Sequence, residues 1–470
     1  MAKAPLAQAV LGLLRFALPP VFLEELYEQQ RGQCYQGLLS FSTLVQVINS
    51  ALLQFHGSGR QAIHQAIQND ELPCQGRAVY DKLHRLPLNL STAFLWQATA
   101  ALRPLLPNSL ADPLPACFSE FTVGILDGKK IKNVAKRLLV ARGQSGKLLG
   151  SMLLAWYDPV ARMIAGIEVD RDGEANENRL VEKLLARAQT QASLRRLWVC
   201  DALYCDLVQI ALHQSYGHHF VLRYHPKLSF TADEQRAAEE LYDPVNQRRL
   251  RQEWGWVGAA SDPRRTYVRR VCWLREGNQA ALIAVTDLAD SDRYPAAAIM
   301  ALYLHRWQIE SVFQEITELF QLRKLIGCTP EAVTFQAAFS MVIYNIVQLV
   351  KAYVAEVGPT EPLAIDEVST KMLFNDLSRE LQVLVWMIPA DSLAVLIETP
   401  PTAEAMRRWL AELLQGRWEK LWRKARNKTK RKYGPKPKGK RGQSGHTSVH
   451  RLQQKYAQQQ KKASLLETDT

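Results

Sequence analysis

The sequence predicts an α/β fold in which a sheet covered by helices is interrupted by a β-rich insertion and flanked by helical regions. Apolar runs alternate with stretches of helical spacing between residues 118 and 224. A polar region, 225–290, then separates them from a long amphipathic helix. The chain has 470 residues, which is too long for one ordinary core, so we expect several domains.

Residues 1–115 are predicted to be a helical N-terminal domain. Apolar side chains recur at helical spacing in 41–48 and again in 94–102. Helix starts are indicated at Ser58 and Arg77, and they suit a compact DNA-binding unit and an ordinary helical subdomain equally well. The proline-rich stretch 106–117 predicts a linker.

The segment 118–224 is predicted to contain three strands, a helix, a strand, a helix and a strand. The expected strands are 121–127, 148–157, 163–169, 197–201 and 219–223, and the expected helices are 174–191 and 203–213. Two of these strands end in an acid. Asp127 ends the first and is followed by Gly128, and Asp201 ends the fourth.

The insertion, 225–290, is expected to be β-rich because two strand-like runs, 266–274 and 281–286, close it. An amphipathic helix begins at Pro295 and reaches at least Leu319, within a segment 291–330 that we assign to the catalytic core.

Residues 331–415 are predicted to be helical again. Their most apolar part, 332–350, contains Gln336, Asn345 and Gln348. These polar side chains favour a buried core helix over a membrane span.

The net charge of +13 is concentrated near the C-terminus. Residues 417–441 contain thirteen Lys or Arg and one acid, a net charge of +12. We therefore expect 416–470 to be a basic, disordered tail that binds a polyanion, with Lys428, Lys430, Arg431 and Lys432 as candidate DNA contacts. The alternative is a solvated extension that only aids solubility. Seven scattered cysteines fit reduced thiols in a cytosol.

Three acids suit the chemistry of phosphodiester cleavage. That chemistry uses two divalent ions, roughly 3.5–4 Å apart, held by carboxylates on rigid elements. Asp127, Asp201 and Glu310 lie on two strand ends and a helix, and we predict them as both catalytic residues and metal ligands. Taken singly, each strand-terminal Asp has an ordinary explanation as a turn or helix-cap residue.

The helix that carries Glu310 has the more specific pattern. Tyr303, Arg306 and Glu310 are spaced i, i+3 and i+7, which places them on one helical stripe. The full pattern, Y-x2-R-W-x-I-E-x2-F, resembles the signature helix of DDE transposases of the bacterial insertion-sequence-four group, which has a Tyr-Arg-Glu-Lys signature. The run Ala-Val-Thr-Asp-Leu at 284–288 and the Asp127-Gly128 strand also occur where this group has them.

This resemblance covers about residues 120–330 and implies a ribonuclease-H-like core interrupted by a β-rich insertion. It implies that Asp127 bridges two Mg²⁺ or Mn²⁺ ions, while Asp201 and Glu310 each complete one. Tyr303 and Arg306, with the adjacent Trp307, would contact DNA.

The implied activity is cut-and-paste transposition: metal-dependent cleavage at transposon ends and strand transfer into target DNA. It would be carried out by a homodimer in a synaptic complex, in the bacterial cytoplasm and associated with the nucleoid. A base flipped from the DNA would stack on a tryptophan of the insertion, and Trp254, Trp256 and Trp273 are the candidates, although each also fits ordinary packing.

Two departures from the group's pattern keep other readings open. Thr317 stands where the group has a lysine, and Asp201 is followed by Ala-Leu-Tyr rather than the commoner Arg. Arg323 or Lys324, about two helical turns on from Thr317, could contribute a cation. The alternatives are a catalytically impaired, transposase-derived DNA-binding protein and a ribonuclease-H-like nuclease without strand transfer.

Overall fold

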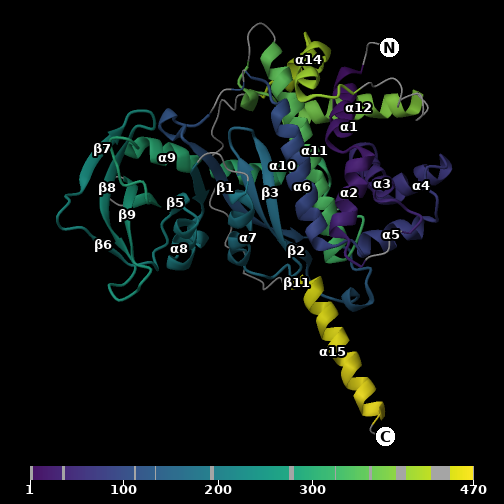
Figure 1. Cartoon of the computed structure of the whole chain (residues 1–470), viewed down its shortest axis with the longest axis horizontal. Helices are drawn as coiled ribbons and strands as arrows, with labels where there is room; N and C mark the ends of the chain where they lie inside the picture. The colour runs from purple at the N-terminus through teal and green to yellow at the C-terminus, as the bar shows by residue number, and fades with distance from the viewer. Residues whose placement is uncertain are drawn as a thin grey trace.

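The computed structural model describes residues 4–33, 37–108, 110, 113–132, 134–190, 195–274, 280–322, 324–358, 363–387, 399–424 and 445–468. They form a mixed α/β structure built on one sheet, whose path runs β11-β2-β1-β4-β5-β10-β9-β8-β6, with β3 paired to β2 and β7 to β8. In Figure 1 the sheet runs from the helical body on the right to a second lobe on the left.

The middle of the sheet has the predicted order of elements. Its strands are β1 (Phe121–Lys132), β2 (Leu148–Asp158), β3 (Met163–Asp170), β4 (Arg195–Cys200) and β5 (His219–Arg223), with α7 (Asn178–Gln189) and α8 (Leu207–Ser215) between them. β1, β4 and β5 are parallel, whereas β2 is antiparallel to β1 and β3 antiparallel to β2. The three-strand, helix, strand, helix, strand order is therefore confirmed.

The expectation that Asp127 ends its strand is wrong. β1 continues to Lys132 because β2 goes on pairing with it, for example at Lys129↔Leu153. On its other side β1 pairs with β4 only as far as Ile125↔Val199. Asp127 therefore lies beyond the end of one neighbouring strand but in the middle of its own.

The insertion is β-rich, but its strands extend the central sheet rather than forming a separate one. They are β6 (Phe230–Ala232), β7 (Glu239–Asp243), β8 (Arg248–Val257), β9 (Thr266–Leu274) and β10 (Ala280–Thr286). β10 joins them to β5 in antiparallel pairing. β6, β7 and β8 were not predicted, because exposed polar side chains such as Arg249 and Arg251 hide their apolar alternation.

The remaining helices cover the body of the molecule. They are α1 (Pro5–Ala17), α2 (Pro20–Gln30), α3 (Phe41–Leu53), α4 (Gly59–Gln68), α5 (Gly76–His84), α6 (Leu88–Leu102), α9 (Ala296–Leu304), α10 (Trp307–Leu319), α11 (Pro330–Val357), α12 (Thr370–Met387), α14 (Ala403–Leu414) and α15 (Val449–Thr468). The two faces of the sheet belong to two cores. Ile125 packs into the core of α6, α10 and α11, and the next residue, Leu126, into that of α7 and α8.

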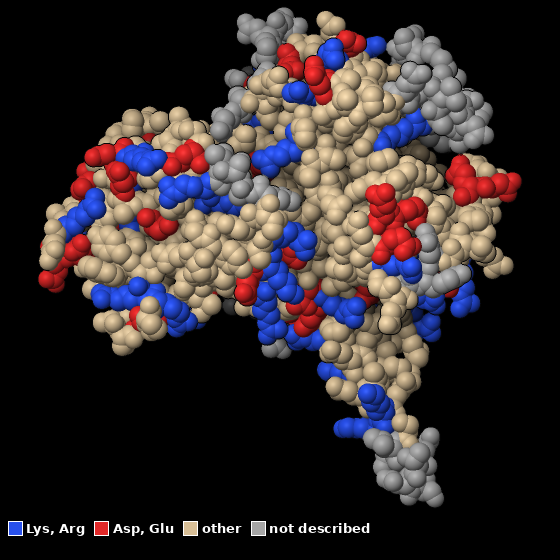
Figure 2. Space-filling view, viewed as in Figure 1, with Lys and Arg blue, Asp and Glu red and all other residues tan. Residues whose placement is uncertain are grey.

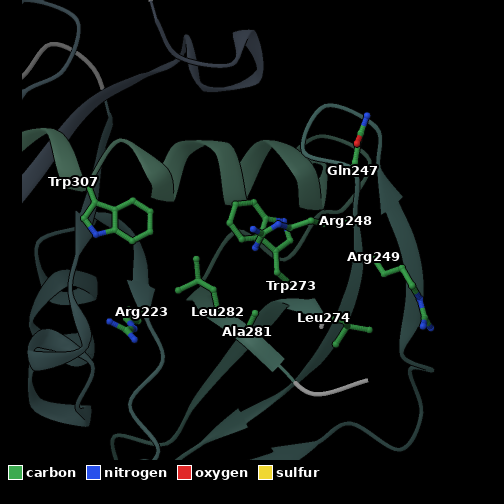
Figure 3. A pocket seen from close by; sticks show the side chains of 9 residues that line it. All are labelled: Arg223, Gln247, Arg248, Arg249, Trp273, Leu274, Ala281, Leu282 and Trp307. Carbon is green, nitrogen blue, oxygen red and sulfur yellow. The ribbon is translucent and has the colours of Figure 1, made fainter. Parts of the chain in front are cut away.

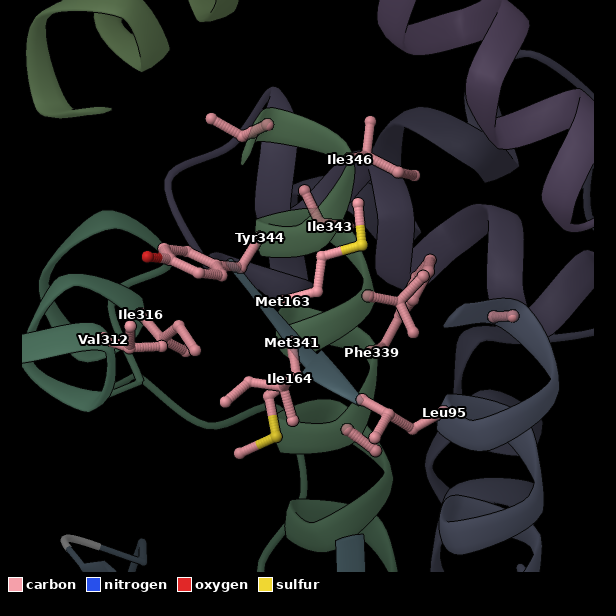
Figure 4. Packing of buried hydrophobic residues seen from close by; sticks show 14 of the residues in the cluster. Leu95, Met163, Ile164, Val312, Ile316, Phe339, Met341, Ile343, Tyr344 and Ile346 are labelled. Atoms are coloured by element: carbon pink, nitrogen blue, oxygen red, sulfur yellow. The ribbon is translucent and has the colours of Figure 1, made fainter. Parts of the chain in front are cut away.

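α11 is the central core helix, as its polar side chains predicted. By length and composition it could cross a membrane, but its most apolar window is entirely enclosed by the rest of the protein. Asn345 fixes it against β3, since its amide exchanges two 2.9 Å hydrogen bonds with the backbone of Ile164. Figure 4 shows Ile343 and Tyr344 of this helix near Met163 of β3 and Ile316 of α10.

The single helix expected from Pro295 to Leu319 is two helices, α9 and α10. Between them the backbone forms tighter bonds, with the Arg306 N–H donating to the Tyr303 carbonyl at 3.1 Å. The turn falls inside the signature pattern, so Tyr303 belongs to α9, Arg306 to the junction and Glu310 to α10. The spacing alone did not reveal this turn, because the residues just before it and just after it are both helical.

The C-terminal region differs from the expected disordered tail in the parts that are described. A 3-10 turn (Lys420–Trp422) precedes the most basic stretch, and β11 (Thr447–Ser448) and α15 follow it. β11 adds a parallel strand beside Leu148 at the edge of β2. Arg451 then contacts Asp172 at 2.8 Å and Glu174 at 2.9 Å. Beyond this anchor α15 projects away from the body (Figure 1).

We expect residues 446–470 to stabilise the fold through this anchor. Ending the chain at Gly445 should lower the melting temperature by several degrees, because it removes β11, the fully buried Val449 and both contacts of Arg451. Burial of the valine alone contributes about 1.5–3 kcal/mol. The matched control ends at Gln458, which removes only the exposed half of α15; equal melting temperatures for the two truncations would contradict the anchor.

Candidate active site

The register of the sheet brings the two predicted aspartates side by side. Ile125 pairs with Val199, and Asp127 in β1 and Asp201, the first residue after β4, each lie two residues further on. Neighbouring strands of a sheet are spaced about 4.8 Å apart. The same register continues into β5, where Leu222 pairs with Cys200, so Arg223 is level with Asp201. An ion pair of 3.8 Å joins Arg223 to Asp201.

Asp201 also has the ordinary structural role that its position allowed. Its carboxylate accepts a 2.8 Å hydrogen bond from the Ala202 N–H and caps the 3-10 turn Ala202–Tyr204. The capping bond and the ion pair both fall on the same oxygen, Oδ1. These contacts hold the carboxylate at the end of β4.

Glu310, in α10, and Arg306, at the junction before it, complete the predicted set. α10 packs on β1, and the Arg306 guanidinium contacts the Glu310 carboxylate at 2.6 Å. The arginine side chain is only 4% exposed, whereas that of Glu310 is 51% exposed. The pair is thus more than an exposed helix salt bridge, because its cation is buried beside Asp127.

A further carboxylate at this site, Glu177, was missed by the sequence analysis. It precedes α7 on the opposite face of β1 from α10, and a Cβ on Gly128 would overlap its carboxylate. Tyr204, from the turn after Asp201, donates a 2.9 Å hydrogen bond to it. Glu177 therefore touches both the strand of Asp127 and the turn of Asp201. Only the glycine after Asp127 hinted at such a close approach.

These neighbours set the protonation of Asp127. Burial is the largest influence, and the negative charges of Glu177 and Glu310 add to it, so the pKa of Asp127 rises from 3.8 to about 7. The positive charge of Arg306 opposes the shift but does not cancel it. Burial also raises the pKa of Glu177, against the hydrogen bond from Tyr204.

The donor set fits a divalent cation, although its oxygens are not gathered around one point. Among the described residues, no three Asp, Glu, His or Cys side chains lie close enough to hold an ion. Arginines hold two of the acids instead: Arg306 binds Glu310, and Arg223 binds Asp201. The Asp127 carboxylate is buried near two other acids, and the positive charge of Arg306 does not fully balance their negative charge. A divalent cation, which binds oxygen ligands, would supply the missing positive charge.

The other predicted contact residues differ in their exposure. Tyr303 is fully buried, and the Arg306 guanidinium lies next to its hydroxyl. Trp307 is 44% exposed and lies over the Arg306 guanidinium at 5.5 Å. Lys428, Lys430, Arg431 and Lys432 lie outside the described residues, as does Arg323. Direct DNA contact by any of these residues stays a prediction.

Trp307 lines a pocket of about 1000 Å³ between α10 and the far half of the sheet. Its lining residues are Arg223, Gln247, Arg248, Arg249, Trp273, Leu274, Ala281, Leu282 and Trp307. Figure 3 shows Trp307 and Trp273 on opposite sides of this space, with Arg248 over Trp273, where the guanidinium lies 4.9 Å from the ring centre. The pocket is both aromatic and positively charged, which suits nucleic acid.

The three tryptophans of the insertion have different surroundings. Trp254 is fully buried, and its indole N–H donates to the Ala289 carbonyl at 2.8 Å, so it packs inside the sheet. Trp256 stacks edge-on against Tyr267, with ring centres 4.9 Å apart. Of the three, Trp273 lines the pocket. Figure 2 shows further Lys and Arg on the same lobe and on the central body.

Comparison with known proteins shows what this part of the chain is similar to. Residues 119–346 match a family model described as the transposase DDE domain. Asp127, Asp201 and Glu310 all lie inside the matched range, as do the pocket and Glu177.

Individual relatives add less. Over 65 residues the chain is 35% identical to a putative transposase, y4zB, of Sinorhizobium fredii; the match spans 14% of this chain and 18% of the relative. A solved structure, the synaptic complex of piggyBac transposase with hairpin DNA, shares 9% identity over 86% of this chain and 85% of that one. Its TM-score is 0.39, a value at which two structures need not share a fold.

The raised pKa of Asp127 predicts that, in the metal-free protein, its charge lowers the stability of the fold to an extent that depends on pH. Because the folded protein holds this proton up to about pH 7 and the unfolded chain releases it near 3.8, ionisation of Asp127 destabilises the fold as the pH rises between these values. In EDTA, Asp127→Asn should therefore gain melting temperature over the wild type from pH 5 to pH 8. A difference that does not change with pH would contradict the burial of this charge.

Proposed function

We propose that the chain is a DNA transposase that cleaves DNA at transposon ends and joins the freed ends to target DNA by cut-and-paste transposition. The observation that carries the proposal is the level placement of Asp127 and Asp201 on adjacent strands, with Glu310 facing Asp127 from α10. This placement occurs within the range that matches the transposase DDE domain. It supports a ribonuclease-H-like core of the insertion-sequence-four kind.

Asp127, Asp201 and Glu310 would hold two divalent ions, Mg²⁺ or Mn²⁺. When bound, the ions supply activation of the attacking oxygen and stabilisation of the leaving one. By the resemblance, Asp127 would be a ligand of both ions, and Asp201 and Glu310 of one each. Glu310 is half exposed and tied to a single guanidinium, so its carboxylate can turn away from Arg306 toward Asp127.

The protein's cations would balance and orient the charges. The Arg306 side chain is 4% exposed and contacts Glu310, and we infer that its charge keeps Asp127, Asp201 and Glu310 together before metal binds. By the resemblance, Arg306 would also contact the DNA. The pocket of Trp307, Trp273 and Arg248 would hold nucleotides next to the cleaved bond. The basic stretch 417–441 would bind DNA without sequence preference. By the resemblance, two copies would pair two DNA ends in the bacterial cytoplasm.

A catalytically impaired DNA-binding protein derived from a transposase is the second candidate. Thr317 in place of a lysine favours it, and so does the ion pair that occupies Glu310. The two candidates differ in one activity, metal-dependent cleavage. A duplex that carries the DNA flanking the coding gene is the substrate that separates them.

The first prediction concerns the three acids. Replacing Asp127, Asp201 or Glu310 by Ala should abolish Mg²⁺-dependent cleavage of this duplex, because each replacement removes a ligand, while binding of the duplex stays within a few-fold. Gel assays of cleavage and of binding on the same protein preparations measure both. Cleavage at the wild-type rate by one variant would remove that residue from the site; no cleavage by the wild type would favour the impaired protein.

The second prediction concerns the pocket. Trp307→Ala and Arg248→Ala should each weaken binding of the duplex about tenfold, since a base stacked on an aromatic ring contributes about 1–3 kcal/mol. Arg408→Ala is the control, because Arg408 is an exposed arginine of α14 whose side chain is 71% accessible. If all three variants bind equally, the pocket does not hold DNA.

A further inference from the structure

Lys129 lies on the same face of β1 as Asp127, two residues further along the strand. Alternate residues of a strand share a face and lie about 6.6 Å apart. On this face Asp127 is followed by Lys129, whereas Gly128 faces Glu177 on the other side. The lysine therefore extends the row that begins with the central acid of the site.

α10 covers this row with a matching stripe. Glu310, Phe313 and Thr317 are spaced i, i+3 and i+7, so they lie along one face of the helix. The Lys129 ammonium lies over the Phe313 ring, 5.2 Å from its centre. It is thus placed between the levels of Glu310 and Thr317, at the seam between β1 and α10.

The ammonium of Lys129 is not held in an ion pair by the described residues. Within the described part of the chain, no carboxylate lies within ion-pair distance of it, unlike Arg306 and Arg223 nearby. Its contact with Phe313 is a cation–π interaction, which leaves the three N–H donors available.

Thr317, which stands where the resembled group has a lysine, does not provide a cation on this face. Its hydroxyl donates to the Phe313 carbonyl at 2.7 Å. The side chain at 317 is therefore short and turned back on its own helix. Lys129 reaches the same stripe from the strand instead.

We propose that Lys129 binds a phosphate of the DNA strand held at Asp127, supplying from β1 the positive charge that α10 lacks at Thr317. The inference rests on the proposed function, since it assigns a contact to the same DNA. Lys129 lies two residues along β1 from Asp127, which would bind the metal. Its ammonium would therefore meet the phosphate next to the one being cleaved. Lys129 is then a substrate-binding residue of the active site.

The experiment moves the charge from the strand to the helix. Lys129→Ala and Lys129→Gln should lower Mg²⁺-dependent cleavage of the flanking-DNA duplex at least tenfold, with little change in melting temperature. The double variant Lys129→Ala with Thr317→Lys should recover most of this loss, because the new lysine starts from the same stripe. Lys183→Ala, an exposed lysine of α7 on the other face of the sheet, is the matched control and should cleave as the wild type does.

Salt dependence of duplex binding gives a readout that does not depend on cleavage. Loss of one phosphate contact should reduce the slope of log affinity against log salt by about 0.9, and the double variant should restore it. If the wild type cleaves and Lys129→Ala matches it in rate and slope, the role of Lys129 is overturned and the transposase proposal stands. If Thr317→Lys does not restore the cleavage lost in Lys129→Ala, the claim that a lysine at 317 and one at 129 reach the same phosphate is also overturned. If the wild type neither binds nor cleaves the duplex, both proposals fail.

Discussion

The site depends on how the negative charge around Asp127 is balanced. Burial of its carboxyl, together with the negative charges of Glu177 on one face of the sheet and Glu310 on the other, raises the pKa of Asp127 to about 7. Arg306 is buried against these acids and gives up the hydration of its charge to stay there. The protein thus holds several carboxylates whose negative charge one guanidinium balances only in part. Such an arrangement costs stability unless a cation adds to it, and that cost is the physical reason to expect a metal here.

The sheet register determines which groups meet. One alignment, Ile125 with Val199 and Cys200 with Leu222, sets Asp127 in β1, Asp201 just after β4 and Arg223 in β5 at the same level of the sheet. α11 packs directly on this sheet and is fixed to β3 through the amide of Asn345, and α10 contacts both α11 and β1. A change in the packing of these core helices would therefore move Glu310 relative to Asp127 without touching either residue.

The sequence predicted much of this arrangement because its signals are local. Apolar runs located the five strands of the core, and the motif from Tyr303 to Phe313 located the helix that faces them. Features that depend on neighbours in space were not predictable. β1 runs past Asp127 because β2 pairs with it, and Glu177 belongs to the site because α7 begins beside Gly128. The ordered return of the chain at β11 is likewise fixed by distant residues, Leu148 and Asp172.

The central claim is that Asp127 and the carboxylates around it form one divalent-metal site. Replacing Mg²⁺ by Fe²⁺ and adding ascorbate and peroxide tests it most directly, because hydroxyl radicals formed at bound iron cut the polypeptide next to the ion. We predict cuts in β1 at Asp127, before α7 at Glu177, after β4 at Asp201 and in the first turn of α10 at Glu310, all suppressed by excess Mg²⁺ and lost in Asp127→Asn. Cuts elsewhere in the chain, or the same cuts in Asp127→Asn, would contradict it.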